Sequence, residues 1–144
     1  MAENPIISDE FKNKTGVEWE LGVYEIEKGM IRRFARAIDD PNPLWDTMAP
    51  PIFIVTIGSE QFGEKVITPM FQDGLLHGST ELEFYQPVRP GDKITVTGKI
   101  ADIRERSRMA FVTFEISYTN QRHKLVAKCQ QTMIAYQTER ARND

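Results

Sequence analysis

The stretch DDPNPLWD, from Asp39 to Asp46, gathers chemically capable side chains in a short loop. A carboxylate such as that of Asp40 can act as a general acid or base when its surroundings tune its pKa. It can also serve structure alone, because an aspartate before proline often starts a turn and accepts a hydrogen bond from a backbone amide two residues on. Negative charge at the end of a preceding helix is unfavourable. We therefore favour Asp40 as a site residue over Asp40 as a simple helix stop.

Histidine and cysteine offer few further reactive groups. His77 is the one histidine in a segment expected near a substrate, and it could pair with Glu81 or Glu83 as acid and base. In a regular strand, however, His77 would share the side of Ser79 and those glutamates, away from the apolar side chains. A solvated or partner-facing position is the favoured interpretation. Two histidines and one cysteine, Cys129, give no metal-ligand cluster in the sequence.

Composition excludes several classes of function. The 144 residues include 18 basic and 21 acidic ones that are interspersed along the chain, so no basic surface indicates nucleic-acid binding. The longest apolar run, Pro50 to Gly58, is far shorter than the roughly 20 residues that a membrane-spanning helix needs. A single cysteine and an N-terminus without a signal-peptide pattern predict a cytoplasmic protein.

Two helices are predicted, one on each side of the loop. From Lys28 to Asp39, apolar side chains recur at the spacing of one helical face, with three arginines opposite. Pro41 and Pro43 end this helix, because proline lacks an N–H and disfavours helical geometry in the residue before it. A second helix is predicted from Pro50 to about Gly63, since proline suits a first helical turn. It is apolar on nearly all sides and must be enclosed, although its β-branched content leaves a strand as the alternative.

The remainder of the chain alternates with period two. Four long strands are predicted over residues 76–88, 93–103, 109–120 and 124–136, joined by short polar connections. Such short connections imply an antiparallel meander. Alternate apolar residues of the third strand form its predicted core face: Ala110, Val112, Phe114, Ile116 and Tyr118. Curling one sheet around an apolar helix gives a single α+β domain over residues 1–144.

Four segments together resemble one family, the MaoC-like dehydratases, also called (R)-specific enoyl-CoA hydratases. In chain order they are YEIEKGMIRRFARAIDDPNP, APPIF, LHGSTELEFYQPVRPGDKITV and YTNQRHKLVAKCQQTMI. The resemblance covers Val17 to Ile134, and its most specific piece is the turn P-V-x-P-G-D at Pro87 to Asp92. It implies a hot-dog fold with a core over about residues 17–137, in which a long sheet wraps a central helix. It also implies dimers whose sheets join edge to edge.

The resemblance further implies an activity and its substrates. The reaction would be reversible addition of water to a trans-2-enoyl thioester carried by CoA or acyl carrier protein, with no other cofactor. In active family members, an aspartate and a histidine spaced D-x-x-x-x-H after the first helix transfer the protons. This spacing places Asp40 on the aspartate and Trp45 on the histidine. An indole has one N–H donor and no accessible pKa, so Trp45 cannot replace imidazole in proton transfer.

A second departure concerns the start of the central helix. The family carries a His-Gly pair there, and its backbone amides face the thioester oxygen. Pro50 and Pro51 of this chain supply no N–H, which leaves the amides of Ile52 and Phe53 for that role. The substrate contacts implied by the resemblance are Asn42, Trp45, Pro51, Ile52 and Phe53.

Three functions follow. The leading hypothesis is a non-catalytic, substrate-binding subunit of an enoyl-thioester hydratase acting on fatty-acid or steroid side chains, inactive alone and completed by a second hot-dog subunit that carries Asp and His. This hypothesis is based on the presence of Trp45, Pro50 and Pro51. The second is an active homodimeric hydratase with relocated acid–base groups, Asp40 with His77 or a glutamate. The third is an acyl-thioester-binding module without catalysis.

Overall fold

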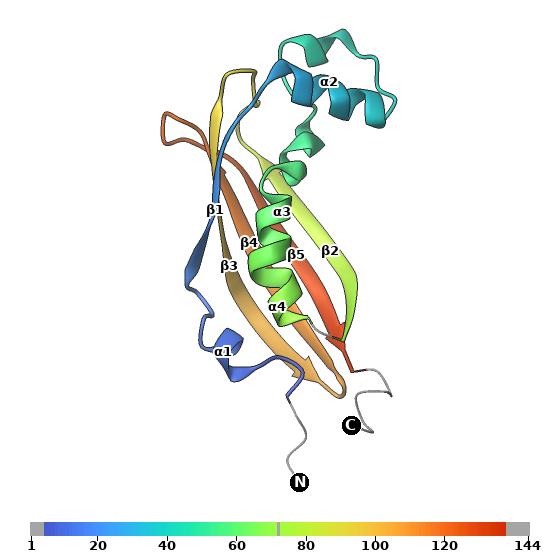
Figure 1. Ribbon diagram of the computed structural model, residues 1–144, viewed down its shortest axis with the longest axis vertical. Coiled ribbons are helices and arrows are strands. Elements are labelled where there is room, and N and C mark those ends of the chain that lie inside the picture. Colours follow the sequence, from blue (N-terminus) through green and yellow to red (C-terminus); the bar gives the residue numbers. More distant parts are fainter. Residues whose placement is uncertain (1–4, 72, 138–144) are drawn as a thin grey trace.

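The computed structural model describes residues 5–71 and 73–137. One long antiparallel sheet curves around a central helix (Figure 1). At one end lies a lobe formed by α2 (Lys28–Ala37) and the loop that follows it to Asp46, which we call the α2 lobe. The strands of the sheet are β1 (Glu18–Glu25), β2 (Gly74–Phe84), β3 (Lys93–Arg106), β4 (Met109–Thr119) and β5 (Leu125–Tyr136), and the short helix α1 (Asp9–Lys12) precedes them. The sheet order is β1-β3-β4-β5-β2. The α+β class and the sheet wrapped around a helix agree with the prediction.

The four predicted strands are present, but the predicted meander holds for β3, β4 and β5 alone. β2 pairs with β5 at the edge of the sheet, so the turn before β3 does not close a hairpin. The backbone of this turn bonds instead to the segment after β1: the Gly91 amide donates to the Ile26 carbonyl at 2.7 Å, and the Ile26 amide donates to the Asp92 carbonyl at 2.8 Å. A short connection between strands therefore misled the topology prediction.

β1 was not predicted, and a bulge explains why. Its pairing with β3 shifts between Glu20 and Val23, and Gly22 has a positive φ of 106°. The buried side chain of Leu21 and the inward-facing Tyr24 are consequently separated by three positions rather than two. One extra residue thus breaks the alternation by which a strand is recognised.

The first predicted helix is confirmed as α2 (Lys28–Ala37), which buries Ile31 and Ala35. The second predicted helix was expected to start at Pro50, and this start was wrong. The segment after Pro50 forms a separate 3-10 helix, η2 (Pro51–Thr56), and Gly58 then turns the chain with a φ of 77°. The central helix comes after this turn and consists of α3 (Ser59–Phe62), the π-helical η3 (Gly63–Ile67) and α4 (Thr68–Met70). No helix of the described residues is long and apolar enough to cross a membrane.

The core lies between the central helix and the facing side of the sheet. The predicted core face of β4 is confirmed, because its five alternate residues are all buried. Phe114 is fully buried, and its ring meets that of Phe62 edge to face at a centroid distance of 5.1 Å. Burying a side chain of this size contributes roughly 1.5–3 kcal/mol. The central helix is therefore held by the middle of the sheet, and the α2 lobe projects beyond it (Figure 1).

Candidate functional site

The loop after α2 is shaped by its own polar side chains. Asp39 adopts a positive φ of 53°, and the Asp40 amide donates to the Ala35 carbonyl at 2.9 Å. The Asp40 carboxylate accepts a hydrogen bond from the Asn42 amide at 3.2 Å, and the Asn42 side chain accepts one from the Leu44 amide at 3.0 Å. The second bond caps the 3-10 helix η1 (Pro43–Asp46). Asp40 and Asn42 thus both have a structural role in this protomer.

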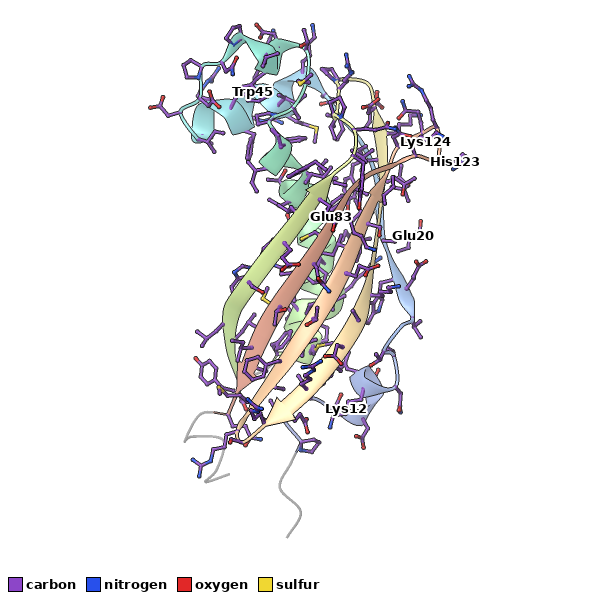
Figure 2. All side chains as sticks on the ribbon, turned by 180° about the vertical axis from the view of Figure 1, so that it is seen from behind. Lys12, Glu20, Trp45, Glu83, His123 and Lys124 are labelled. Carbon is purple, nitrogen blue, oxygen red and sulfur yellow. The ribbon has the colours of Figure 1, made fainter. Side chains whose placement is uncertain are left out.

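Trp45 lies in the α2 lobe (Figure 2), partly buried against the hydrophobic core. Its Nε1 is sealed from solvent and has no hydrogen-bond partner among the described residues. An unpaired buried donor costs about 1–3 kcal/mol, and it cannot act as a base. With Arg32, Arg36, Asp40 and Asn42, Trp45 lines a cavity of about 400 Å³. The predicted loop residues therefore come together, but around an indole instead of an imidazole.

The residues from Pro51 to Phe53 point in different directions. Phe53 is buried, and its ring contacts that of Phe34 edge to face at 5.5 Å. Its amide donates to the Pro50 carbonyl at 2.9 Å, so the expectation that this amide is free was wrong. The Phe53 amide is used by a hydrogen bond of the 3-10 helix, whereas the sequence predicted an α-helix that starts at Pro50. The Ile52 amide has no such backbone partner among the described residues, and the Ile52 side chain is 45% exposed.

A bulge in β2 places His77 on the side of the sheet that faces the central helix. His77 pairs with Met133, whereas Ser79 pairs with Thr132, so Gly78 is the extra residue. The predicted face for His77 was therefore wrong, because regular alternation stops at this bulge. The His77 side chain is nevertheless exposed, as the solvated interpretation expected. The His77 Nε2 lies 2.7 Å from the Thr80 Oγ1.

The suggested pairing of His77 with a glutamate does not form. Glu81 and Glu83 pair with Gln130 and Lys128 of β5, on the outer face of the sheet. Glu83 accepts a hydrogen bond from the Tyr85 hydroxyl, which raises the pKa of Tyr85. The bulge therefore separates the histidine from both candidate carboxylates.

A cavity of about 440 Å³ lies between the central helix and the sheet. This volume falls within the usual range for ligand pockets, and most of its wall is apolar. Burial raises the pKa of the Tyr118 hydroxyl and of the Cys129 thiol, so both stay protonated near neutral pH. The lining residues with polar side-chain atoms are Ser59, His77, Thr80, Tyr118, Cys129 and Gln131.

Sequence reasoning missed Tyr118 and Gln131 as wall residues of a cavity. It treated Tyr118 as core and did not single out Gln131. The available signal was a hydroxyl and an amide at alternate positions of buried strands, where such groups need a partner. Ile52 lines the same cavity.

One protomer does not unite the predicted acid and base. Asp40, Asn42 and Trp45 line the loop cavity, whereas His77 lines the cavity beside the central helix, and the two walls share no residue. Pro51 lines a third cavity of about 290 Å³, between η2 and the end of β2. Within a single chain the geometry therefore supports binding better than proton transfer between Asp40 and His77.

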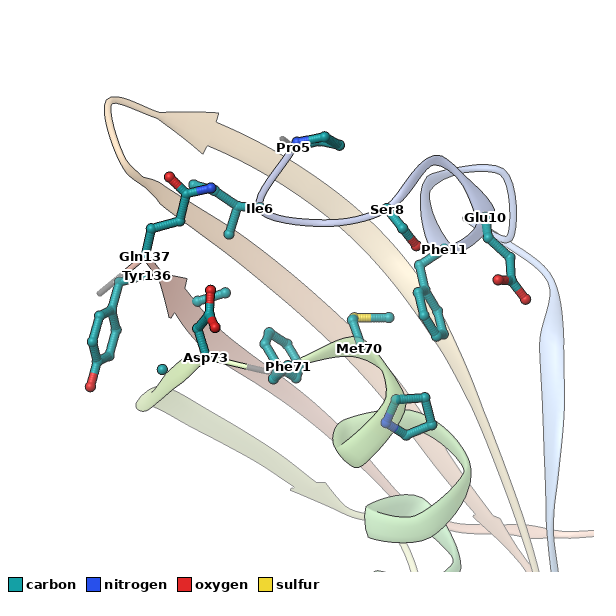
Figure 3. Close-up of a pocket in the computed structure, with 13 residues that line it drawn as sticks. Pro5, Ile6, Ser8, Glu10, Phe11, Met70, Phe71, Asp73, Tyr136 and Gln137 are labelled. Carbon is teal, nitrogen blue, oxygen red and sulfur yellow. The ribbon is translucent and has the colours of Figure 1, made fainter. Parts of the chain in front are cut away.

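A further cavity lies at the other end of the sheet, near α1 (Figure 3). It measures about 570 Å³, and Glu10 and Asp73 lie on its wall with Phe11 and Phe71. None of the predicted site residues is part of it. Two carboxylates on its wall would repel an anionic ligand.

Comparisons with known proteins agree with this architecture. Residues 13–129 match the family model described as FAS1-like, dehydratase domain region. A UPF0336 protein of Streptomyces avermitilis is 33% identical over 96 residues, which are 56% of this chain and 64% of that relative. The match thus spans less than two thirds of that relative's length.

Two solved structures show the same fold. The truncated HadBC (3R-hydroxyacyl-ACP dehydratase) complex of Mycobacterium tuberculosis has a TM-score of 0.72 at 23% identity, covering 85% of this chain and 97% of that one. An (R)-hydratase of A. caviae involved in PHA biosynthesis has a TM-score of 0.64 at 17% identity, covering 83% and 94%. Both similarities confirm the predicted hot-dog fold.

Proposed function

Because the chain belongs to the family of FAS1-like dehydratase domains, we propose that it is the acyl-thioester-binding subunit of a two-subunit enoyl-thioester hydratase. The other subunit would be a second hot-dog chain that supplies the aspartate and the histidine. The substrate would be a trans-2-enoyl thioester on CoA or acyl carrier protein, and no further cofactor is needed. The chain alone would bind substrate without turning it over.

Trp45 is the observation that carries the proposal. Hydration needs one group that activates water and one that protonates the α-carbon. The family resemblance places Trp45 at the position of the histidine, and its side chain's one polar atom is sealed and has no partner among the described residues. The neighbouring Asp40 carboxylate accepts the Asn42 amide. A loop of this composition can wall in a substrate but lacks half of the proton chemistry.

Two features support the binding role. The cavity of about 440 Å³ beside the central helix offers a largely apolar wall for an acyl chain. Arg32 and Arg36 line the loop cavity next to Trp45. Guanidinium groups suit the phosphates of CoA or of a phosphopantetheine arm.

The edge strand β2 supports a partner. β2 has one neighbouring strand, β5, so its other side presents unpaired backbone groups. Leu76, Phe84 and Tyr85, on this strand and just after it, are 53%, 47% and 51% exposed. A second hot-dog subunit that joins here would cover them. The HadBC complex, whose chain shares this fold, is itself described as a complex.

The test compares this chain alone with this chain co-purified with a second small hot-dog chain that retains D-x-x-x-x-H. The substrates are crotonyl-CoA and dodecenoyl-CoA, and dodecanoyl-CoA serves as the ligand for calorimetry. We expect the lone chain to bind dodecanoyl-CoA without hydrating either substrate, and the pair to hydrate them. In the pair, Asp40→Asn in this chain should leave the rate nearly unchanged, while the same change in the partner's motif should abolish it. Full hydration by the lone chain would contradict the proposal.

A second candidate, an active homodimer, is favoured by the orientation of His77 alone. The imidazole lines the acyl cavity and bonds to Thr80 at 2.7 Å. It would have to work with a carboxylate from the second copy, because Asp40 of the same protomer lines a different cavity. In that case the lone chain is active, and His77→Ala and Asp40→Asn each lower turnover by orders of magnitude. A pair that binds ligand but never turns it over would instead indicate a binding module.

A further inference from the structure

A line of polar side chains crosses the largely apolar cavity and has no part in the leading proposal above. These residues, which we call the polar track, are Tyr118, Cys129, Gln131, Thr80 and His77. The strand register orders them. Tyr118 begins the track on β4, Cys129 and Gln131 follow on β5, and Thr80 is the direct partner of Gln131 on β2. The track therefore runs diagonally over three strands.

Tyr118 is the member of the track that most needs a ligand. The residue is 2% exposed, yet its hydroxyl makes no hydrogen bond with another described residue. It is not sealed in packed protein either, because Trp45 Nε1 is the one sealed and unpartnered side-chain atom of the described residues. The Tyr118 oxygen therefore opens on the cavity. A buried hydroxyl without a partner is unusual in a protein interior.

The dimensions of the track suit an elongated ligand. Tyr118 and Phe114 are four residues apart on β4, and Phe114 is the register partner of Gln131. At roughly 3.3 Å per residue, about 13 Å separate the two rows. Apolar side chains, including Ile116 and Met133, line the wall between and beside them. A suitable ligand thus has an extended apolar body and an oxygen atom at one point along it.

We propose that the cavity selects an acyl chain that carries a hydroxyl or oxo substituent beyond the carbons that take part in hydration, and that Tyr118 donates a hydrogen bond to this oxygen. The inference rests on the proposed function and names the class of acyl group. A plain alkyl chain would cover the Tyr118 hydroxyl and leave it unpaired. A site built to pair with an oxygen discriminates against the analogue that lacks it.

Calorimetry with two kinds of ligand tests this inference. One ligand is dodecanoyl-CoA, and the others are hydroxydodecanoyl-CoA isomers with a single hydroxyl at successive carbons beyond the reacting ones. We expect one isomer to bind the wild type roughly five- to tenfold more tightly than dodecanoyl-CoA. Tyr118→Phe should remove this preference while the affinity for dodecanoyl-CoA changes by less than about twofold. The matched control is Tyr136→Phe, because Tyr136 lies on the wall of the cavity near α1.

Each other outcome has a distinct meaning. If all isomers bind like dodecanoyl-CoA, the cavity takes plain chains and the inference is wrong, while the proposed function stands. If Tyr118→Phe weakens both kinds of ligand equally, Tyr118 bonds the thioester oxygen, and the inference is again wrong. If the protein binds neither ligand, the proposed function fails, and the inference fails with it.

Discussion

Gly63 offers the sharpest test of where an acyl chain binds. It lies in the central helix with a φ of −60° and a ψ of −49°, so it does not need the conformational freedom of glycine. A Cβ added at this residue would meet no heavy atom within 4 Å, and Gly63 lines the cavity of about 440 Å³. Gly63→Ala should stabilise the fold by about 0.5–1 kcal/mol. The upper figure corresponds to a rise in Tm of roughly 2–4 °C.

A larger side chain at the same residue should separate stability from binding. Gly63→Leu should keep the fold at least as stable as the wild type while its side chain occupies the cavity. If it displaces on the order of two to three methylene groups of the ligand, at about 0.8 kcal/mol each, the affinity for dodecanoyl-CoA falls about 15- to 50-fold. Thermal unfolding and calorimetry measure the two quantities.

A matched control for Gly63 is available in α2. Gly29 is also helical, and a Cβ there would also meet no heavy atom within 4 Å, but Gly29 does not line this cavity. Gly29→Leu should therefore raise stability without changing affinity. Wild-type affinity in a stable Gly63→Leu variant would refute the reasoning, because the acyl chain would then bind elsewhere.

Three further perturbations test the walls of the cavity. Gly58 has a φ of 77° and an added Cβ would lie 3.2 Å from Val96 Cγ1, so Gly58→Ala should cost about 1–3 kcal/mol in urea unfolding. Phe114 is fully buried among aromatic rings, and Phe114→Ala should cost about 3–5 kcal/mol in the same assay. Burial raises the pKa of Tyr118 above its ordinary value of 10.0, so the folded protein keeps a proton that the unfolded chain releases. Stability should therefore fall as the pH rises above 10.0, and Tyr118→Phe should flatten that slope; parallel losses in both proteins would exclude Tyr118 as the cause.

The features that sequence reasoning predicted correctly are those that depend on unbroken periodicity. The core face of β4 follows from strict alternation, and α2 follows from a regular helical spacing ended by proline. The errors fall where one residue interrupts a period. Gly22 hides β1, and Gly78 turns His77 to the opposite face of the sheet. An isolated glycine in a strand pattern can indicate a bulge, but whether one forms depends on the pairing with a neighbouring strand.

The start of the central helix was predicted wrongly for a related reason. Pro50 and Pro51 suit the first turn of a helix, and the local pattern alone cannot tell an α-helix from a 3-10 turn. Gly58 adopts a left-handed conformation that separates η2 from the central helix, which begins at Ser59. That left-handed turn also puts Gly58 and Gly63 on the wall of the same cavity. The candidate acyl site is thus a product of the irregularity that the prediction missed.

The loop and the cavity differ in what they require of the sequence, and this difference bears on the proposed division of labour. The two side-chain bonds that shape the loop come from Asp40 and Asn42, and neither uses the side chain of residue 45. Residue 45 can therefore be a tryptophan without disturbing the backbone turn. The cavity, in contrast, is walled by core residues such as Ile116 and Val96, whose replacement would cost the fold itself. A chain of this fold can therefore vary residue 45 at little cost in stability, whereas changes to the residues that wall this cavity destabilise it.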